Sequence, residues 1–452
     1  MSHVLVESCD VVVTMDDAGT EIAGGSVLLR DGVIAWVGSG APPVVPDDRV
    51  DGRGTVAIPG LVNTHHHLFQ SLTRARAQDR GLFDWLVELY PTWARLDADW
   101  ARTAALVGLA ELALSGCTTS ADHQYLFPRG RAGVLEATVA AAAEIGLRFH
   151  PTRGSMDLGA AQGGLPPDDV VEDLDEILAA TEAAVTRFHD PGLGAMVRIA
   201  VAPCSPFSVT ERLMRESATL ARRLGVRLHT HLAETVEEED YCRERYGRRP
   251  AELMEEWGWL GDDVWLAHCV HLNAADVARI AAAGAGVSWC PSSNLRLGAG
   301  GAPAPALLDA GATVGLGVDG SASNDAGDLA AEVRQALLLT RAAHGAGALS
   351  AREALRVATR GGAACLGRDD IGSIEVGKRA DLALFPVDGL ATAGAEVDPV
   401  AALVLCRPGR VRHLLVEGRA VVRDGVLRTA DEAAIAQAGH RAGRALAEGG
   451  TR

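Results

Sequence analysis

Short apolar runs alternate with helical segments across the middle of this chain. The segments between the runs are alanine-rich and amphipathic, as at 100–114 and 210–224. The eight runs begin near Val56, Thr118, Leu147, Val197, Val226, Val264, Gly286 and Thr313. Eight strand–helix units over roughly 270 residues predict an α/β fold, a TIM-like (β/α)8 barrel. A doubly wound sheet is the alternative, but it would not bring the first and last strands together.

Both ends of the chain contain additional β-rich runs. They lie at 11–15, 26–29 and 33–37, and again at 381–385, 411–416 and 420–422. Neither group is sufficient for a stable sheet alone. We therefore predict a small composite β-sandwich domain from residues 1–56 and 372–430. The barrel would span 57–371, and a C-terminal helix would span 431–452.

Composition excludes several classes of function. The net charge of −17 argues against a nucleic-acid partner or an anionic membrane surface, since both require a basic patch. The sequence has no apolar segment long enough to span a bilayer, and its first residues show no signal peptide. The eight cysteines include no Cys-x-x-Cys pair, which suits a reducing compartment. We expect a cytoplasmic protein that acts on small molecules.

Histidines and a carboxylate stand where several apolar runs end. His65 and His67 are two residues apart at the end of the first run, so in an extended chain their side chains point the same way. His231, His268 and Asp319 end the runs that we count as strands 5, 6 and 8. Because catalytic residues of such barrels lie at the carboxyl ends of the strands, these side chains should converge. Such a set suits a catalytic divalent metal with one position open for water.

The motifs around these residues resemble the amidohydrolase superfamily. The matching segments occur in family order at 59–67, 231–234, 267–271, 317–320 and 372–381. Within the superfamily, the chain looks like the group that holds 8-oxoguanine deaminase and the hydroxylated-triazine aminohydrolases. The segments that carry this finer resemblance are 66–74, 82–86, 122–128 and 163–168.

The resemblance implies roles for individual residues. The implied metal ligands are His65, His67, His231 and Asp319. The metal would be zinc by default, although iron or manganese could occupy the same ligands. The implied catalytic residues are Glu234, His268 and Asp319. Glu234 would shuttle protons, His268 would hydrogen-bond the substrate or hydroxide, and Asp319 would take a proton from water with its second oxygen.

The lysine content indicates one metal rather than two. Relatives with two metals bridge them with a carbamylated lysine at strand 4, whereas Lys378 is the only lysine here and falls in the predicted β domain. The segment 200–206, where strand 4 should end, offers neither lysine nor glutamate.

The resemblance implies hydrolytic deamination of a small nucleobase. We predict 8-oxoguanine as substrate, with urate and ammonia as products and isocytosine as a possible second substrate. The predicted substrate-binding residues are Gln70, Trp85, Trp93, Tyr125 and Cys204. Cys204 stands where several nucleoside-processing relatives carry histidine, which disfavours a large nucleoside.

Other functions remain open at this point. They are an s-triazine aminohydrolase or chlorohydrolase and a deaminase of S-adenosylhomocysteine or thiomethyladenosine. A non-enzymatic scaffold is disfavoured, because scaffolds of this type lack ligands that this chain retains. Relatives are often oligomeric, so we also expect a homo-oligomer.

Overall fold

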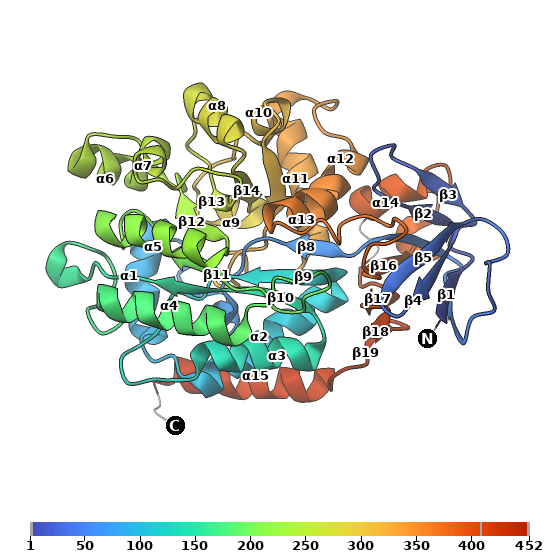
Figure 1. The fold of residues 1–452 in the computed structure, drawn as a ribbon, viewed down its shortest axis with the longest axis horizontal. Coiled ribbons are helices and arrows are strands. Elements are labelled where there is room, and N and C mark those ends of the chain that lie inside the picture. Colours follow the sequence, from blue (N-terminus) through green and yellow to red (C-terminus); the bar gives the residue numbers. More distant parts are fainter. Residues whose placement is uncertain (1–2, 407–408, 450–452) are drawn as a thin grey trace.

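The computed structural model describes residues 3–406 and 409–449, and its centre is a closed barrel of eight parallel strands (Figure 1). The strands are hydrogen-bonded in sequence order, and the last pairs with the first. They are β8 (Leu61–Asn63), β9 (Cys117–Asp122), β10 (Arg148–Ser155), β11 (Ala200–Pro203), β12 (Leu228–Leu232), β13 (Val264–His268), β14 (Gly286–Trp289) and β15 (Thr313–Leu316). The predicted barrel is confirmed.

The first apolar run divides into two strands with different partners. β7 (Thr55–Pro59) pairs with a strand from the chain's other end, and β8 enters the barrel. Gly60 lies between them, where a Cβ atom would stand 2.1 Å from the Thr118 hydroxyl oxygen. Only glycine allows this approach, so the chain leaves one sheet and joins the next within one residue. The first apolar run, expected to be one strand, is therefore two strands.

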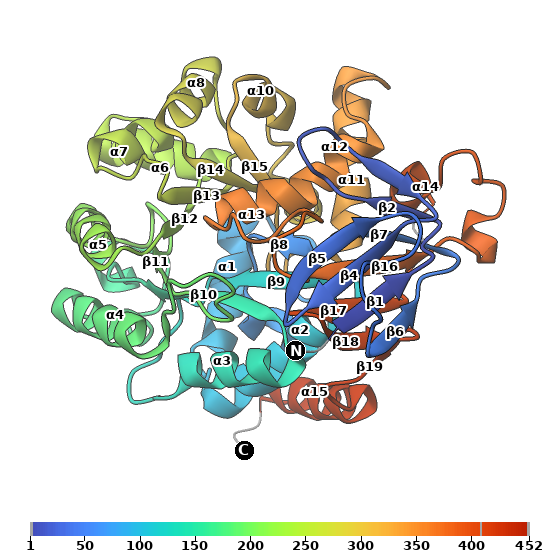
Figure 2. The same cartoon turned by 45° about the vertical axis from the view of Figure 1, so that its right-hand side comes forward.

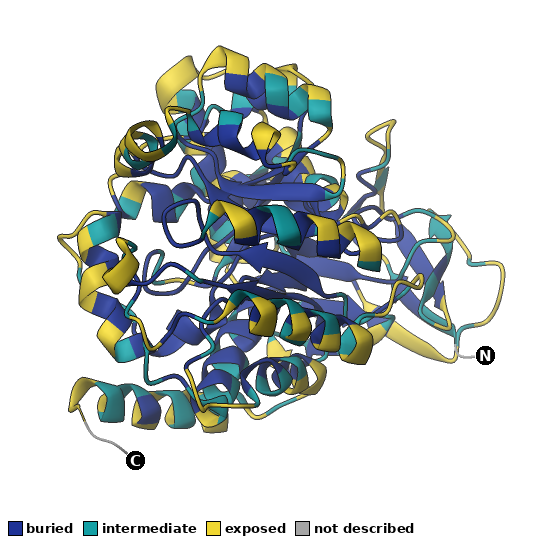
Figure 3. Cartoon of the chain, turned by 60° about the vertical axis from the view of Figure 1, so that its left-hand side comes forward, coloured by how far each residue is buried: buried dark blue, intermediate teal, exposed yellow. Residues whose placement is uncertain are grey.

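Helices surround the barrel and bury their apolar faces against it, as the exposed outer faces in Figure 3 show. The surrounding helices are α2 (Ala98–Leu114), α3 (Val134–Ile145), α4 (Leu174–Phe188), α5 (Glu211–Leu224), α6 (Val236–Tyr246), α7 (Pro250–Glu256), α8 (Ala274–Ala283), α10 (Ala304–Asp309), α11 (Leu329–His344), α12 (Ala351–Arg356) and α13 (Gly362–Cys365). Four further elements lie in the loops: η1 (Leu68–Leu72), α1 (Leu82–Trp93), η2 (Ala160–Gln162) and α9 (Pro291–Arg296).

Two sheets pack beside the barrel, one of N-terminal strands alone and one that combines strands from both chain ends (Figure 2). One has the order β5-β4-β1-β6, and the other has the order β19-β18-β17-β16-β7-β2-β3. Their N-terminal strands, besides β7, are β1 (His3–Glu7), β2 (Val11–Val13), β3 (Glu21–Ala23), β4 (Ser26–Arg30), β5 (Val33–Gly38) and β6 (Asp48–Asp51). Their C-terminal strands are β16 (Leu382–Pro386), β17 (His413–Val416), β18 (Arg419–Arg423) and β19 (Val426–Leu427). The antiparallel β7–β16 pair joins the two ends of the chain.

A buried arginine connects the barrel to these sheets. Arg148, the first residue of β10, donates to both carboxylate oxygens of Asp381 at 2.6 and 3.0 Å. It also pairs with Glu417, which follows β17. Because Arg148 is fully buried, removing either side of this network would leave an uncompensated charge in the interior.

Further helical elements lie near the C-terminal strands. η3 (Val357–Gly361) joins α12 to α13, η4 (Leu390–Thr392) and α14 (Pro399–Leu405) lie between β16 and β17, and α15 (Glu432–Ala447) follows β19 and packs on α2. Residues 450–452 of the predicted C-terminal helix and residues 1 and 2 of the predicted β domain lie outside the described residues. None of the helices in the described part combines the length and apolar character needed to cross a membrane.

Candidate active site

The predicted site residues gather at one end of the barrel. His65 and His67 follow β8, His231 lies in β12, His268 ends β13, and Asp319 follows β15. All five side chains are buried. Parallel strands in a closed barrel present their carboxyl ends together, so residues far apart in sequence meet there.

Three histidines are oriented by hydrogen bonds on their Nδ1 sides. His67 Nδ1 donates to the carbonyl of His123 at 2.8 Å, and His231 Nδ1 donates to that of Cys204 at 2.6 Å. His65 Nδ1 lies 2.8 Å from His229 Nε2, whose own Nδ1 bonds the Trp265 carbonyl. In this arrangement each Nε2 keeps a free lone pair that faces the barrel axis.

These nitrogens and Asp319 form a geometry that fits a metal ion. His67 Nε2 lies 3.0 Å from His231 Nε2, and Asp319 Oδ1 lies 3.3 Å from Nε2 of both His65 and His67. A tetrahedron with bonds of 2.0–2.1 Å has edges of about 3.3 Å. His65 Nε2 is buried and has no hydrogen-bond partner. Burial lowers the pKa of His67 to about 3, so this ring is neutral and able to ligate at neutral pH.

Asp319 is held by donors on both oxygens. Oδ1 accepts from the Gly320 amide at 2.7 Å. Oδ2 accepts from the hydroxyls of Ser293 at 2.6 Å and Ser323 at 3.0 Å. Burial acts to raise the pKa of this carboxyl, but His65 and the other neighbouring histidines outweigh it and hold the pKa well below its usual value. Asp319 is therefore a firmly ionised and fixed group.

The backbone turns sharply at these strand ends. Ala233, His268, Cys269 and Asp319 all have positive φ, between 50° and 70°. Such left-handed conformations cost roughly 1–3 kcal/mol each for residues other than glycine, and they concentrate at functional sites. Here they aim His268 and Asp319 toward the cavity.

Glu234 and His268 face each other across the site. Glu234 Oε2 lies 3.6 Å from His268 Nε2, and both side chains are almost completely buried. Burial raises the pKa of Glu234 to about 7. Burial lowers the pKa of His268, but Glu234 and Asp319 more than reverse this and leave it raised. Glu234 is therefore suited to gain and lose a proton near neutral pH.

A small cavity connects these groups. It measures about 30 Å³, which is room for about two water molecules. Its lining includes Gln70, Trp85, Tyr125 and Cys204 from the predicted substrate-binding set. Trp93 is not among the lining residues and lies one layer behind, packed edge-to-face on Trp85 with ring centroids 5.1 Å apart. The other lining residues are His67, Leu82, Leu86, Tyr90, Ser205, Phe207, His231, Glu234, His268, Leu297, Asp319 and Ser323.

Several residues at the site were not predicted from the sequence. Ser293 and Asn294 bond Asp319 and His268, and both lie on α9 directly after β14. Their position directly after the seventh apolar run is the sequence feature that could have identified them as site residues. His123, which follows β9, stacks on His231 with ring centroids 4.6 Å apart, and its Nδ1 has no partner. It joins His65, His67 and His231 in a group of nearby nitrogens that could hold a metal.

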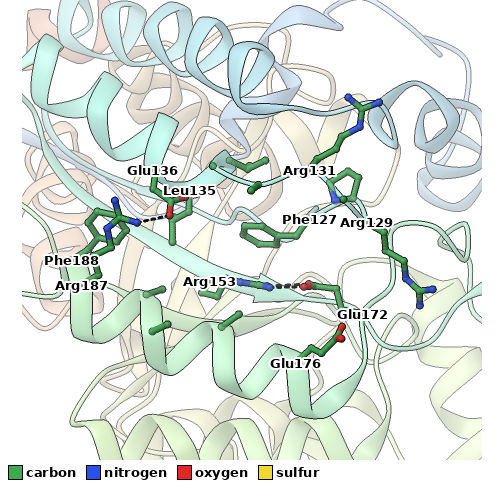
Figure 4. Close-up of a pocket in the computed structure, with 18 of the residues that line it drawn as sticks. Phe127, Arg129, Arg131, Leu135, Glu136, Arg153, Glu172, Glu176, Arg187 and Phe188 are labelled. Atoms are coloured by element: carbon green, nitrogen blue, oxygen red, sulfur yellow. Dashed lines mark hydrogen bonds and ion pairs between the residues drawn. The ribbon is translucent and has the colours of Figure 1, made fainter.

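A larger cavity of about 890 Å³ lies outside the barrel beside α3 and α4 (Figure 4). Four of its charged side chains form two ion pairs. Arg153 bonds Glu172 at 2.6 Å and stacks over the Phe127 ring, and Arg187 bonds Glu136 at 2.8 Å. The cavity contains none of the histidines or carboxylates described above.

Fold and site together define a barrel hydrolase with a histidine–carboxylate metal centre. Residues 56–421 match the model of the amidohydrolase family. The chain belongs to this family, as its motifs predicted, and is a hydrolase that acts on carbon–nitrogen bonds.

Three known proteins show how far this similarity extends. The chain is 49% identical to 8-oxoguanine deaminase from Pseudomonas aeruginosa, over 94% of this chain and 95% of that protein. It is 40% identical to hydroxydechloroatrazine ethylaminohydrolase from a Pseudomonas species, over 97% and 94% of the two chains. The crystal structure of zinc-bound atrazine chlorohydrolase from Arthrobacter aurescens TC1 is 35% identical, with a TM-score of 0.93 over 97% of this chain and 100% of that chain.

Proposed function

We propose that this protein is a metal-dependent deaminase of 8-oxoguanine that forms urate and ammonia. The observation that carries the choice of substrate is the 49% identity, over nearly the whole chain, to 8-oxoguanine deaminase. His65, His67, His231 and Asp319 would hold a single zinc ion. A metal held there lowers the pKa of a water molecule toward about 7. Association of the chain with its own copies stays a prediction.

Residues around the cavity carry out the proton transfers and stabilise the charge that develops during the reaction. Glu234 accepts the proton of the attacking water and passes it to the ring nitrogen next to the carbon that carries the amine. It then takes the hydroxyl proton of the tetrahedral adduct and delivers it to the amine, which leaves as ammonia while the C=O bond forms. His268 faces the same carbon and stabilises the charge that develops when water adds. One water molecule is consumed, and the C–N bond to the amine is broken.

This assignment gives Glu234, rather than the second oxygen of Asp319, the first proton transfer. Two serine hydroxyls already donate to Asp319 Oδ2, and its carboxyl has a depressed pKa. Glu234 has a pKa of about 7, close to the best value for a proton shuttle at neutral pH. The two carboxyl groups thus differ in role because their environments differ.

The cavity wall suits a flat ring rather than a nucleoside. Gln70 accepts from the Ala322 amide at 3.3 Å through its carbonyl oxygen, which leaves its amide N–H groups for a ring carbonyl. The Trp85 indole N–H donates to the Ala322 carbonyl at 3.1 Å, so its ring offers an apolar surface. Cys204 lines the cavity at the position where several nucleoside-processing relatives carry histidine. Isocytosine has the same amidine and carbonyl edge, so we include it as a second substrate.

An ammonia-release assay on the zinc-loaded protein tests the substrate. We expect kcat/KM for 8-oxoguanine to exceed that for guanine, adenosine and S-adenosylhomocysteine by factors that can reach about 10⁴, because a wrong ring leaves buried polar groups unpaired. Hydroxyatrazine belongs in the same panel, since a hydroxytriazine aminohydrolase is also similar over nearly its full length. Preference for the triazine would replace the nucleobase assignment.

A further inference from the structure

The imidazole of His268 is held on its far side by a buried asparagine. His268 Nδ1 lies 2.9 Å from Asn294 Oδ1, and Asn294 is completely buried. The Asn294 backbone is itself fixed, because its amide donates to the Cys290 carbonyl at 3.1 Å and its carbonyl accepts from Ala299 at 2.8 Å. The asparagine side chain therefore extends from a rigid point on α9.

The orientation of this amide determines which His268 nitrogen carries a proton. A carbonyl oxygen only accepts, so Oδ1 at 2.9 Å requires a hydrogen on Nδ1. Nε2 then faces Glu234 with a lone pair when the ring is neutral, and carries a second proton only as imidazolium. With the amide reversed, its N–H group would donate to Nδ1 and move the proton of the neutral ring to Nε2.

Asn294 keeps this orientation although its own amide is incompletely satisfied. Its Nδ2 is buried and has no hydrogen-bond partner. Among the described residues, the hydrogen bond that this side-chain amide makes is therefore the one to His268 Nδ1.

The preceding residue on α9 makes the corresponding contact with the other side of the site. Ser293 donates to Asp319 Oδ2 at 2.6 Å. Neighbouring residues of one short helix thus hold a candidate metal ligand and the histidine opposite Glu234. The position of α9 controls the spacing of both groups.

We propose that Asn294 is a positioning residue that fixes the proton of His268 on Nδ1, so that Nε2 faces Glu234 and the reacting carbon. This inference rests on the proposed deaminase function for its effect on rate. The position of the proton can be measured without any substrate. Failure of the two proposals is therefore distinguishable.

The first test is the tautomer in the wild-type protein. Long-range ¹H–¹⁵N spectra of ¹⁵N-histidine-labelled, zinc-loaded protein distinguish a ring protonated on Nδ1 from one protonated on Nε2. The His268→Gln variant identifies the signal by its loss. We expect His268 to be protonated on Nδ1, either as the neutral tautomer or as imidazolium. A neutral ring with its proton on Nε2 would overturn the proposal, and no Asn294 variant is needed for this result.

The second test compares two substitutions of Asn294. Asn294→Leu removes the acceptor, and we expect kcat to fall roughly 10- to 100-fold, the usual effect of losing a group that orients a site residue. KM and zinc content should change little. Asn294→Asp keeps an acceptor oxygen and should restore most of kcat and the Nδ1 proton. Leu295→Gln alters an exposed neighbour on α9 and serves as the matched control.

The results for the two variants support or contradict the positioning role of Asn294. Loss of kcat and of the Nδ1 proton in Asn294→Leu, with recovery of both in Asn294→Asp, supports the positioning role. Equal losses in both variants with the wild-type tautomer retained indicate a packing role and contradict it. If the wild type turns over no substrate of the panel, the proposed function fails, and the spectra alone decide the inference.

Discussion

Arg296 Nε lies 3.1 Å from the carboxylate of Asp325, and this pair holds the loop that precedes α1. The Arg296 guanidinium also donates to the carbonyls of Arg76 at 2.8 Å and Ala77 at 3.3 Å. Asp325 accepts from the Ala75 amide at 2.6 Å. Ala75 and Ala77 both have positive φ, so the loop is kept in a strained form by these bonds.

We expect Arg296→Gln to loosen this loop and the cavity wall formed by α1. Charge-assisted hydrogen bonds contribute ~1.5–3 kcal/mol each, so losing them should raise the open population of the loop roughly tenfold or more. The loop contains Arg76 and Arg80, and limited trypsin digestion followed by mass spectrometry reports cleavage there. Arg248→Gln, at an exposed ion pair elsewhere, is the control. Unchanged cleavage in Arg296→Gln would show that the loop is held by other contacts.

Metal content should separate ligating from packing histidines. We expect zinc-loaded wild type to hold one equivalent by elemental analysis. His231→Ala should lose stoichiometric binding, because it removes one of the nitrogens that face the barrel axis. His123→Asn should keep the metal, since His123 stacks on His231 but is not assigned as a ligand. Retention by His231→Ala, or loss in His123→Asn, would change the ligand set, and a second bridged metal would refute the single-metal proposal.

Glu234→Gln should retain zinc and lose most of its activity. The substitution keeps the size of the side chain but removes the group that transfers protons, a contribution of roughly 10²–10⁴-fold to the rate. Single-turnover rates with 8-oxoguanine, measured beside zinc content, provide the readout. Glu237→Gln, at an exposed position in the first turn of α6, is the control. Near-wild-type kcat in Glu234→Gln would exclude the proton-shuttle role.

A buried carboxyl should make the stability of the protein depend on pH. Burial raises the pKa of Glu332 from 4.5 to about 7, although Ser292 and Asn324 donate to it. The folded state therefore binds the proton more tightly than the unfolded state. This contribution to stability is fully present below pH 4.5 and is lost as pH rises through about 7.

We therefore expect the Tm of metal-free protein to fall less between pH 5 and 8 in Glu332→Gln than in wild type. At pH 5, where the wild-type carboxyl is protonated, the variant should be less stable by about 1 kcal/mol, because one of the two hydrogen bonds to the carboxyl is lost. Thermal unfolding in the absence of metal avoids the contribution of zinc release at low pH. An unchanged slope would mean that other groups cause the pH dependence.

The sequence could predict those parts of the protein that depend on local pattern. The alternation of apolar runs with amphipathic segments is a periodic signal, and it predicted the barrel and the sheets built from both ends. His65, His67, His231, His268 and Asp319 could be selected because they end such runs. In a parallel barrel the active site lies at the carboxyl ends of the strands, so a residue that is predicted to end a strand is also predicted to lie at the site.

The tertiary structure alone decided how neighbouring side chains share hydrogen bonds and space. The contact between Asn294 and His268 joins different strand ends, and no periodicity encodes it. Trp85 and Trp93 both occur in one aromatic helix, yet only Trp85 lines the cavity, because the helix turns Trp93 toward the core. The need for glycine at position 60 follows from the close approach of Thr118, which only the folded chain brings beside it. The succession of strands and helices along the chain is set by each segment's own residues, whereas these contacts depend on the close packing of segments that are distant in the chain.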